Sequence, residues 1–169
     1  RIEIQLDDPA QKARPYCGVV IDGAGFNDSL SGLSNLVALA DITKKADKKA
    51  IVSLMTSVGL SPDNRKKVRY YSLGMRQRLA IAQAIMEDPA ILILDEPTEG
   101  IQPSIIEDIG VAIRRVNQEL GITVLIVEQY LDFVLGISDN LYIMEKGNIV
   151  LEGETSQIPR EKILKYMAE

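Results

Sequence analysis

Apolar residues along this chain follow two different spacings, one typical of strands and one typical of helices. Short apolar runs at 17–21, 91–94 and 122–127 predict three strands, and a polar–apolar alternation over 1–6 predicts another. The run at 91–94 is apolar on both faces and bounded by prolines, which is typical of a buried strand in a parallel sheet. Strands that alternate with helical segments indicate an α/β fold, with a mainly parallel sheet flanked by helices.

Segments whose apolar residues have helical spacing lie between these strands. Apolar residues recur at intervals of three and four in four stretches: Leu33, Leu36, Val37 and Ala40; Ile51, Leu54, Met55 and Val58; Leu79, Ala82, Ile85 and Met86; and Ile105, Ile109, Ile113, Val116 and Leu120. The third stretch stops before Pro89, because a proline disfavours helical backbone in the residue before it. Pro103 and Gly121 suit the beginning and the end of the last helix. We therefore expect a helical insert over 29–64, between the second strand and the helix that follows Gly74.

The carboxyl-terminal part of the chain has a different pattern. Apolar runs at 141–144 and 149–151 flank Glu145-Lys146-Gly147-Asn148, whose glycine and asparagine suit a hairpin turn. Residues 158–169 are predicted to form a short surface helix, to which we assign no function.

Composition and charge narrow the class of protein. The 169 residues are 46% hydrophobic and 25% charged, as in a soluble globular domain. A net charge of −5 does not favour nonspecific binding to nucleic acid, and we expect no nucleic-acid partner. The single cysteine, Cys17, excludes a disulfide within these residues, and we expect it in the core. No signal peptide is visible and no apolar run approaches the roughly 20 residues of a membrane span, so membrane association is expected only through a partner.

Ser72-Leu73-Gly74-Met75 opens the third helical stretch and is the first candidate binding site. Ser72 is a suitable N-cap, and Gly74 would let a ligand approach the backbone closely. The free amides at a helix N-terminus favour an anion such as phosphate. Taken alone, however, these residues fit an ordinary capped helix better than a binding site.

Asp95 and Glu96 follow the buried strand at 91–94 and form the second candidate site. Ligands of open α/β sheets bind at the carboxyl ends of the strands. One carboxylate there can hold Mg²⁺, which prefers hard oxygen ligands, and the next can orient and deprotonate a water that attacks a phosphoryl group. The alternative is a polar strand end that enters a loop, and the two residues alone do not decide between these interpretations.

The order of the two segments resembles that in the ATP-binding cassette (ABC) ATPases. Tyr71-Ser72-Leu73-Gly74-Met75 stands where that family has its Leu-Ser-Gly-Gly-Gln signature, Arg76-Gln77-Arg78 matches the usual continuation, and 91–97 matches the Walker B strand with its catalytic glutamate. The resemblance implies a P-loop NTPase-like (RecA-like) fold with an inserted α-helical subdomain. It divides the chain into an α/β core (1–27 and 88–157), a helical subdomain with the signature helix (28–87) and a C-terminal helix (158–169).

The same resemblance implies a role for each candidate residue, with ATP and Mg²⁺ as cofactors. Glu96 would be the base that orients the attacking water, and Asp95 would hold Mg²⁺. Asp22 stands where the family often has a glutamine that contacts Mg²⁺, and its carboxylate could contact that ion too. Gln129 stands where the family has a switch histidine, and its amide can still donate a hydrogen bond to the γ-phosphate. Ser72, Leu73, Gly74 and Met75 would contact the γ-phosphate of ATP held by a second subunit.

These roles imply an ATP-binding and ATP-hydrolysing subunit that powers solute transport across a membrane. Its partners would be a second ABC ATPase subunit, in a homodimer or heterodimer, and transmembrane permease subunits. It would be cytoplasmic and peripheral to the inner face of the cell membrane. A soluble ABC protein of ribosomes or chromosomes is disfavoured, because the sequence has no coiled-coil heptads and no second cassette.

Two features of the sequence leave an alternative open. The phosphate-binding loop Gly-x-x-x-x-Gly-Lys-[Ser/Thr] is missing from the 169 residues, so we expect the chain to begin just after that Walker A segment. Moreover, residues 19–88 resemble cassettes for antibiotic resistance or lipid export, whereas 94–153 resemble uptake cassettes for urea and branched-chain amino acids. The alternative is a catalytically incomplete fragment, or a chimera joined between about 86 and 94, that folds but does not bind ATP by itself.

Overall fold

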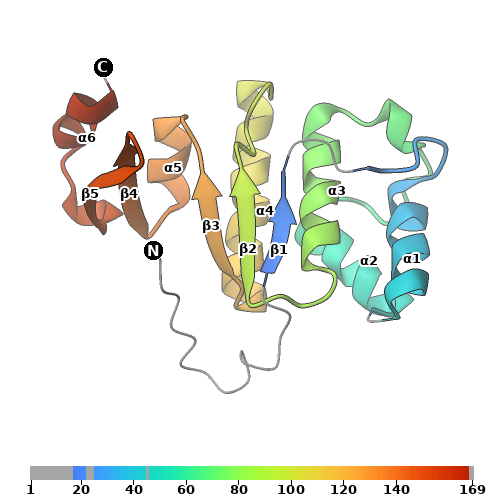
Figure 1. Ribbon diagram of the computed structural model, residues 1–169. Coiled ribbons are helices and arrows are strands. Elements are labelled where there is room, and N and C mark those ends of the chain that lie inside the picture. Colours follow the sequence, from blue (N-terminus) through green and yellow to red (C-terminus); the bar gives the residue numbers. More distant parts are fainter. Residues whose placement is uncertain (1–16, 22–24, 45, 168–169) are drawn as a thin grey trace. The chain divides into compact units, whose positions relative to one another are not determined.

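The computed structural model describes residues 17–21, 25–44 and 46–167, which form two compact units divided between Gln129 and Tyr130 (Figure 1). The first unit contains β1 (Cys17–Val20), α1 (Gly32–Thr43), α2 (Lys48–Ser57), the 3-10 turn η2 (Val68–Tyr70), α3 (Leu73–Ile85), β2 (Ile91–Asp95), α4 (Pro103–Leu120) and β3 (Thr123–Val127). The second contains α5 (Leu131–Ile137), β4 (Asn140–Glu145), β5 (Asn148–Glu154), the 3-10 turn η3 (Thr155–Gln157) and α6 (Arg160–Met167). None of the described helices has the length and apolar character needed to cross a bilayer.

The first unit is built on a parallel three-stranded sheet in the order β1-β2-β3. Val20 of β1 lies opposite Leu94 of β2, and Asp95 of β2 lies opposite Val127 of β3. The strands therefore end at the same edge of the sheet, where the segments that follow them come together. The α/β class and the three parallel strands predicted from the sequence are confirmed, whereas the strand predicted over 1–6 lies outside the described residues.

Helices cover this sheet and extend away from it on one side. α3 packs against β1 and α4, and α2 packs against α1, α3 and α4 (Figure 1). The most deeply buried side chains come from both the helices and the sheet: Leu36, Ile51, Met55, Leu79, Ile81, Ile85, Leu92, Leu94, Ile109 and Ile122. The helical insert predicted over 29–64 is thus confirmed as α1 and α2, which share a core with α3.

Helix boundaries follow from capping side chains and turn residues in the sequence. Ser31 accepts a hydrogen bond from Ser34 N–H at 3.2 Å and caps α1. Asp47 does the same for α2, because its carboxylate accepts from Ala50 N–H at 2.7 Å. α4 begins with Pro103 and ends at Leu120, with Gly121 as its C-cap, as its sequence predicts.

Cys17 is exposed, so the prediction that it is a core residue is wrong. Side chains of β1 alternate between two faces, and α3 covers only the face that carries Gly18 and Val20. At Gly18 a Cβ atom would lie only 2.2 Å from the carbonyl oxygen of Ala84 in α3. Cys17 and Val19 point to the opposite face, and Val19 is 45% exposed.

The second unit is a hairpin with two short helices. β4 and β5 pair antiparallel around Lys146-Gly147, whose φ angles of 48° and 81° are those of a tight hairpin turn. The predicted hairpin and terminal helix are confirmed, but the sequence pattern did not predict α5. Leu141, Leu151 and Ile163 form the buried cluster of this unit.

An ion pair joins the two helices of the second unit. Arg160 Nη1 donates to Asp132 Oδ1 at 2.5 Å, and this hydrogen bond raises the pKa of Arg160. The Arg160 guanidinium therefore stays charged at every pH at which the protein is handled.

Candidate functional site

Four polar residues lie at the edge of the sheet where its strands end. Asp95 is the last residue of β2 and Glu96 follows it, while Glu128 and Gln129 follow β3. Glu96 N–H donates to the carbonyl oxygen of Val127 at 2.9 Å, which continues the strand pairing beyond the end of β2. The parallel register thus places two segments more than thirty positions apart in the sequence beside each other.

Glu96 and Gln129, the two residues predicted as catalytic, are in direct contact. Gln129 Nε2 donates to Glu96 Oε1 at 2.7 Å. Glu96 has a φ angle of +44°, in the left-handed region that residues other than glycine rarely adopt. Such a backbone conformation costs on the order of 1–3 kcal/mol and clusters at functional sites. The backbone conformation of Glu96 and the hydrogen bond from Gln129 therefore both fix the direction of the Glu96 carboxylate.

Asp95, predicted as a metal ligand, is exposed at the strand end. Within the described residues, no donor or cation lies within bonding distance of its carboxylate, and no group of three acidic, cysteine or histidine side chains could hold a metal ion. A lone carboxylate still fits Mg²⁺, because this ion is usually held by one or two carboxylates together with waters and substrate phosphates. Asp22, the other predicted metal ligand, lies outside the described residues.

Ser72 is the N-cap of α3, as the sequence predicts. Its Oγ accepts a hydrogen bond from Met75 N–H at 3.2 Å. Leu73 and Gly74 are the first two residues of the helix, and their amides find no acceptor among the described residues. Leu73 is 51% exposed. The helix N-terminus therefore presents free amides next to an exposed serine, an arrangement that suits an anion.

Gly74 is needed for packing. A Cβ atom at this position would lie 2.3 Å from Cγ2 of Ile105, in the first turns of α4. Leu73 in turn lies against Gly100, in the loop between β2 and α4. The N-terminus of α3 is thus held by the segment that follows Glu96. Among the described residues, however, no hydrogen bond joins Ser72–Met75 to Glu96 or Gln129, so the predicted site residues fall into two separate groups.

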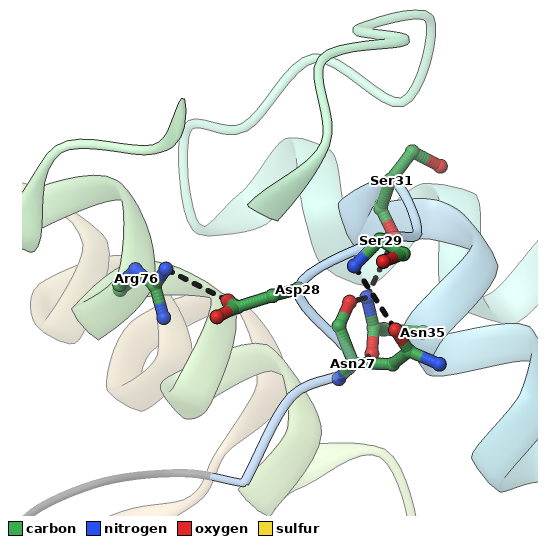
Figure 2. A network of polar contacts seen from close by, with 6 residues as sticks. All are labelled: Asn27, Asp28, Ser29, Ser31, Asn35 and Arg76. Carbon is green, nitrogen blue, oxygen red and sulfur yellow. Dashed lines mark hydrogen bonds and ion pairs between the residues drawn. The ribbon is translucent and has the colours of Figure 1, made fainter. Parts of the chain in front are cut away.

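A polar network ties the start of α3 to the loop that precedes α1 (Figure 2). Arg76 Nη2 donates to Asp28 Oδ1 at 2.8 Å. Asn35 holds the same loop from the other side, since its side chain accepts from Asn27 N–H at 2.7 Å and donates to Asn27 O at 3.1 Å. Asn27 Oδ1 also accepts from Ser29 N–H at 3.0 Å.

Backbone contacts run alongside this network. Val68 N–H donates to Leu30 O at 2.8 Å, and Arg69 N–H donates to Asp28 O at 3.3 Å. The buried hydroxyl of Tyr71 accepts from Gly32 N–H at 3.3 Å, at the first turn of α1. Ser72 is therefore preceded by a segment that is fixed to the N-terminus of α1 at several points.

Sequence reasoning missed two residues of the sheet-edge site, Thr98 and Glu128. Thr98 is 6% exposed, and its N–H donates to Glu128 Oε1 at 2.9 Å. The Thr98 hydroxyl donates to the same oxygen. The two residues are thirty positions apart, so only the acid at the end of a predicted strand could have drawn attention to Glu128.

The arrangement combines an oriented carboxylate, an amide donor, a nearby carboxylate for a hard cation and, separately, a helix N-terminus for an anion. An oriented carboxylate can accept a proton from water, while amide donors stabilise charge on phosphate oxygens. These are the elements of phosphoryl transfer to water.

Comparison with known proteins identifies the family. A profile described as "ABC transporter" matches residues 2–99. The bacitracin transport ATP-binding protein BcrA of Enterococcus faecalis is 37% identical over 141 residues, which are 83% of this chain and 46% of that protein. An alignment of this length necessarily crosses residues 86–94, and the join proposed there stays a prediction.

Solved structures share the fold. CbiO1 of Clostridium perfringens, part of the ABC transporter complex cbiONQ, has a TM-score of 0.73 and 25% identity over 83% of this chain and 57% of its own. The dimeric cassette MJ0796 bound to ADP and Pi has a TM-score of 0.67 and 21% identity over 90% of this chain and 68% of its own. The P-loop NTPase-like fold predicted from the sequence is thereby confirmed.

The chain spans about half the length of the curated relatives that it matches. The match to the family profile nevertheless covers more than half of the chain itself, from 2 to 99. It includes the signature-like turn at Ser72, the packing position Gly74 and the strand end at Asp95 and Glu96. The chain therefore belongs to the ABC transporter family, as part of its ATP-binding domain.

Proposed function

We propose that this chain is part of an ATP-hydrolysing subunit that powers solute transport across a membrane. The observation that carries the proposal is the contact of 2.7 Å between Gln129 Nε2 and Glu96 Oε1, at the carboxyl end of a parallel sheet. Glu96 orients and deprotonates the attacking water, and Gln129 holds its carboxylate and donates to the γ-phosphate. Asp95 holds Mg²⁺, which neutralises charge on the phosphate oxygens when bound.

Ser72, Leu73, Gly74 and Met75 act on a second site. We propose that the N-terminus of α3 contacts the γ-phosphate of ATP held by a second ABC ATPase subunit. Among the described residues, no hydrogen bond joins this group to Glu96 or Gln129. This separation supports the assignment of the two groups to two different sites. MJ0796, which shares the fold, is described as dimeric. Transmembrane permease subunits would bring the protein to the inner face of the membrane, as a cytoplasmic peripheral subunit.

The domain limits stay part of this proposal. The helical subdomain would run over 28–87, inside a core formed by 1–27 and 88–157, followed by the C-terminal helix at 158–169. The proposed helical subdomain at 28–87 is supported by the packing of α1, α2 and α3 against one another beside the sheet.

The proposed role of Glu96 is tested by Glu96→Gln in the complete subunit that contains this chain, assembled with its partners. Glutamine keeps the hydrogen-bond acceptor for Gln129 but cannot accept a proton, so we expect kcat for ATP hydrolysis to fall at least about 100-fold. Nucleotide affinity should change little, because Glu96 is assigned to water and not to ATP.

Glu99→Gln is the matched control for this experiment. This substitution is the same chemical change in the same loop, but the side chain of Glu99 is exposed to solvent. Turnover should stay near that of the unmodified protein. Unchanged turnover in Glu96→Gln, or an equal loss in both variants, would remove Glu96 from the role of base.

A further inference from the structure

Glu128 links the two segments that carry the proposed catalytic residues. Its Oε1 accepts hydrogen bonds from both the N–H and the hydroxyl of Thr98, and its Oε2 accepts from Gln129 N–H at 2.8 Å. Both carboxylate oxygens are therefore engaged, by donors from two different segments of the chain. Glu128 is half-buried and Thr98 is buried, so water competes less for the two Thr98 contacts than for the exposed contact with Gln129 N–H.

These contacts close a ring around Glu96. Gln129 donates through its side chain to Glu96 and through its backbone to Glu128. Glu128 accepts from Thr98, which lies two residues after Glu96 in the chain. Val127 completes the ring, because its carbonyl accepts from Glu96 N–H at 2.9 Å. The backbone of Gln129, which carries the side chain that reaches Glu96, therefore cannot shift without breaking the bond to Glu128 or moving the loop at Thr98.

The chemistry of the three donors requires a carboxylate at position 128. An ionised carboxyl group only accepts hydrogen bonds, and it does so at both oxygens. A glutamine of nearly the same shape has one NH₂ donor, which would face either the Thr98 donors or the Gln129 N–H. Hydrogen bonds to a charged acceptor are also stronger than those to a neutral amide.

We propose that Glu128 is a positioning residue for ATP hydrolysis, which holds Gln129 and the Thr98 loop so that the Glu96 carboxylate keeps its orientation. This inference rests on the proposed function. Glu128 does not act on nucleotide or water. It acts through Gln129 and Thr98, and its loss changes the rate of the chemical step more than the binding of ATP.

The experiment compares Glu128→Gln, Thr98→Val and Thr98→Ser in the complete subunit. We expect Glu128→Gln to lower kcat about 10- to 100-fold, the range typical of residues that orient metal ligands, with KM for ATP changed less than about twofold. Thr98→Val removes only the hydroxyl donor and should give a smaller loss of kcat. Thr98→Ser keeps that donor and should restore kcat to near the unmodified value. Glu99→Gln serves again as the control, because its carboxylate lies in the same loop and is exposed.

A second readout does not depend on catalysis. Thr98 and Gln129 both donate their amide hydrogens to Glu128, so Glu128→Gln should speed hydrogen exchange at one or both amides about tenfold or more, as followed by NMR. Exchange at Leu92, in the middle of β2, should stay unchanged and would report that the sheet is intact.

The outcomes separate the two proposals. If the unmodified protein hydrolyses no ATP, the proposed function fails, and the role of Glu128 fails with it. If the unmodified protein is active and Glu128→Gln speeds amide exchange without lowering kcat, Glu128 is structural and only the positioning role is overturned. Unchanged exchange at both amides would likewise overturn it, because the hydrogen bonds would then not depend on the charge.

Discussion

Gly74 has no room for a side chain, because Ile105 lies directly against it. We expect Gly74→Ala to destabilise the protein by about 1–3 kcal/mol, since the added methyl group forces α3 and α4 apart. Ile105→Ala removes the Cγ2 atom that the new methyl group would meet. The double variant should therefore lose less stability than the sum of the single variants, as measured by urea unfolding.

Gly136 gives a control for this experiment. It lies in α5, and a Cβ atom there would have no heavy atom within 4 Å. Gly136→Ala should leave stability unchanged or raise it by up to about 1 kcal/mol, because alanine favours the helix. Strict additivity of Gly74→Ala and Ile105→Ala would show that the two positions do not meet.

For single residues, the sequence predicted which positions take part in the candidate sites better than it predicted which contacts they make. Ser72 was predictable as an N-cap from local capping rules, and Gln129 was predictable as a candidate site residue from the resemblance to a family. The close approach of Ile105 to Gly74 was not, because it depends on how two helices pack. The same holds for Thr98 and Glu128, which only the register of β2 and β3 brings together.

At the level of the elements, we expect Asn35 to stabilise the loop before α1 more than the ion pair between Asp28 and Arg76 does. Asn35→Ala removes three hydrogen bonds, two to Asn27 and one to Ser31 O, and should cost about 1–2 kcal/mol. Arg76→Gln breaks an ion pair whose side chains are 34% and 58% exposed, so its cost should stay below about 1 kcal/mol. Urea unfolding of the two variants measures both values.

Salt provides the matching control. The Asp28–Arg76 contribution should fade at high ionic strength, because exposed charges are screened, whereas the loss in Asn35→Ala should stay the same. The ranking is contradicted if Arg76→Gln is the more destabilising variant, or if the effect of Asn35→Ala disappears at high salt.

The sequence predicted helices and strands correctly where the spacing of apolar residues agreed with proline and glycine at the ends of the element. α4 has five apolar positions at helical spacing between Pro103 and Gly121, and its limits are those residues. α5 was missed because Leu131–Ile137 is too short for a period to show and Tyr130 gives no side-chain cap. β1 was predicted, but the outward side of Cys17 was not, because nothing local tells which face of a strand is covered.

For the whole molecule, the division at Tyr130 has a consequence for stability. Within the described residues, the central buried cluster of the second unit consists of Leu141, Leu151 and Ile163. We expect a peptide of residues 130–169 to be unfolded by itself, because a segment of about 40 residues rarely buries enough apolar surface to fold alone. Far-UV circular dichroism of the peptide measures this, and a cooperative thermal transition would contradict it.

Amide hydrogen exchange of the whole chain, followed by NMR, is the control. There the signals of β4 and β5 should show slow amide exchange, and Ile163→Ala should speed exchange at Leu151 while leaving Leu92 in the first unit unchanged. The fold class and the family were predictable for the whole chain because the patterns that carry them are local. The division between Gln129 and Tyr130 was not, because it depends on the density of contacts in three dimensions.

The backbone of Glu96 has a consequence for engineering this protein. With a φ angle of +44°, the position would suit glycine or asparagine better than glutamate, so the native side chain works against folding there. A search for thermostable variants that ranks substitutions by melting temperature alone would therefore select Glu96→Gly, and with it a protein that has lost the carboxylate held by Gln129. Screens on this protein should keep position 96 fixed and look for added stability elsewhere.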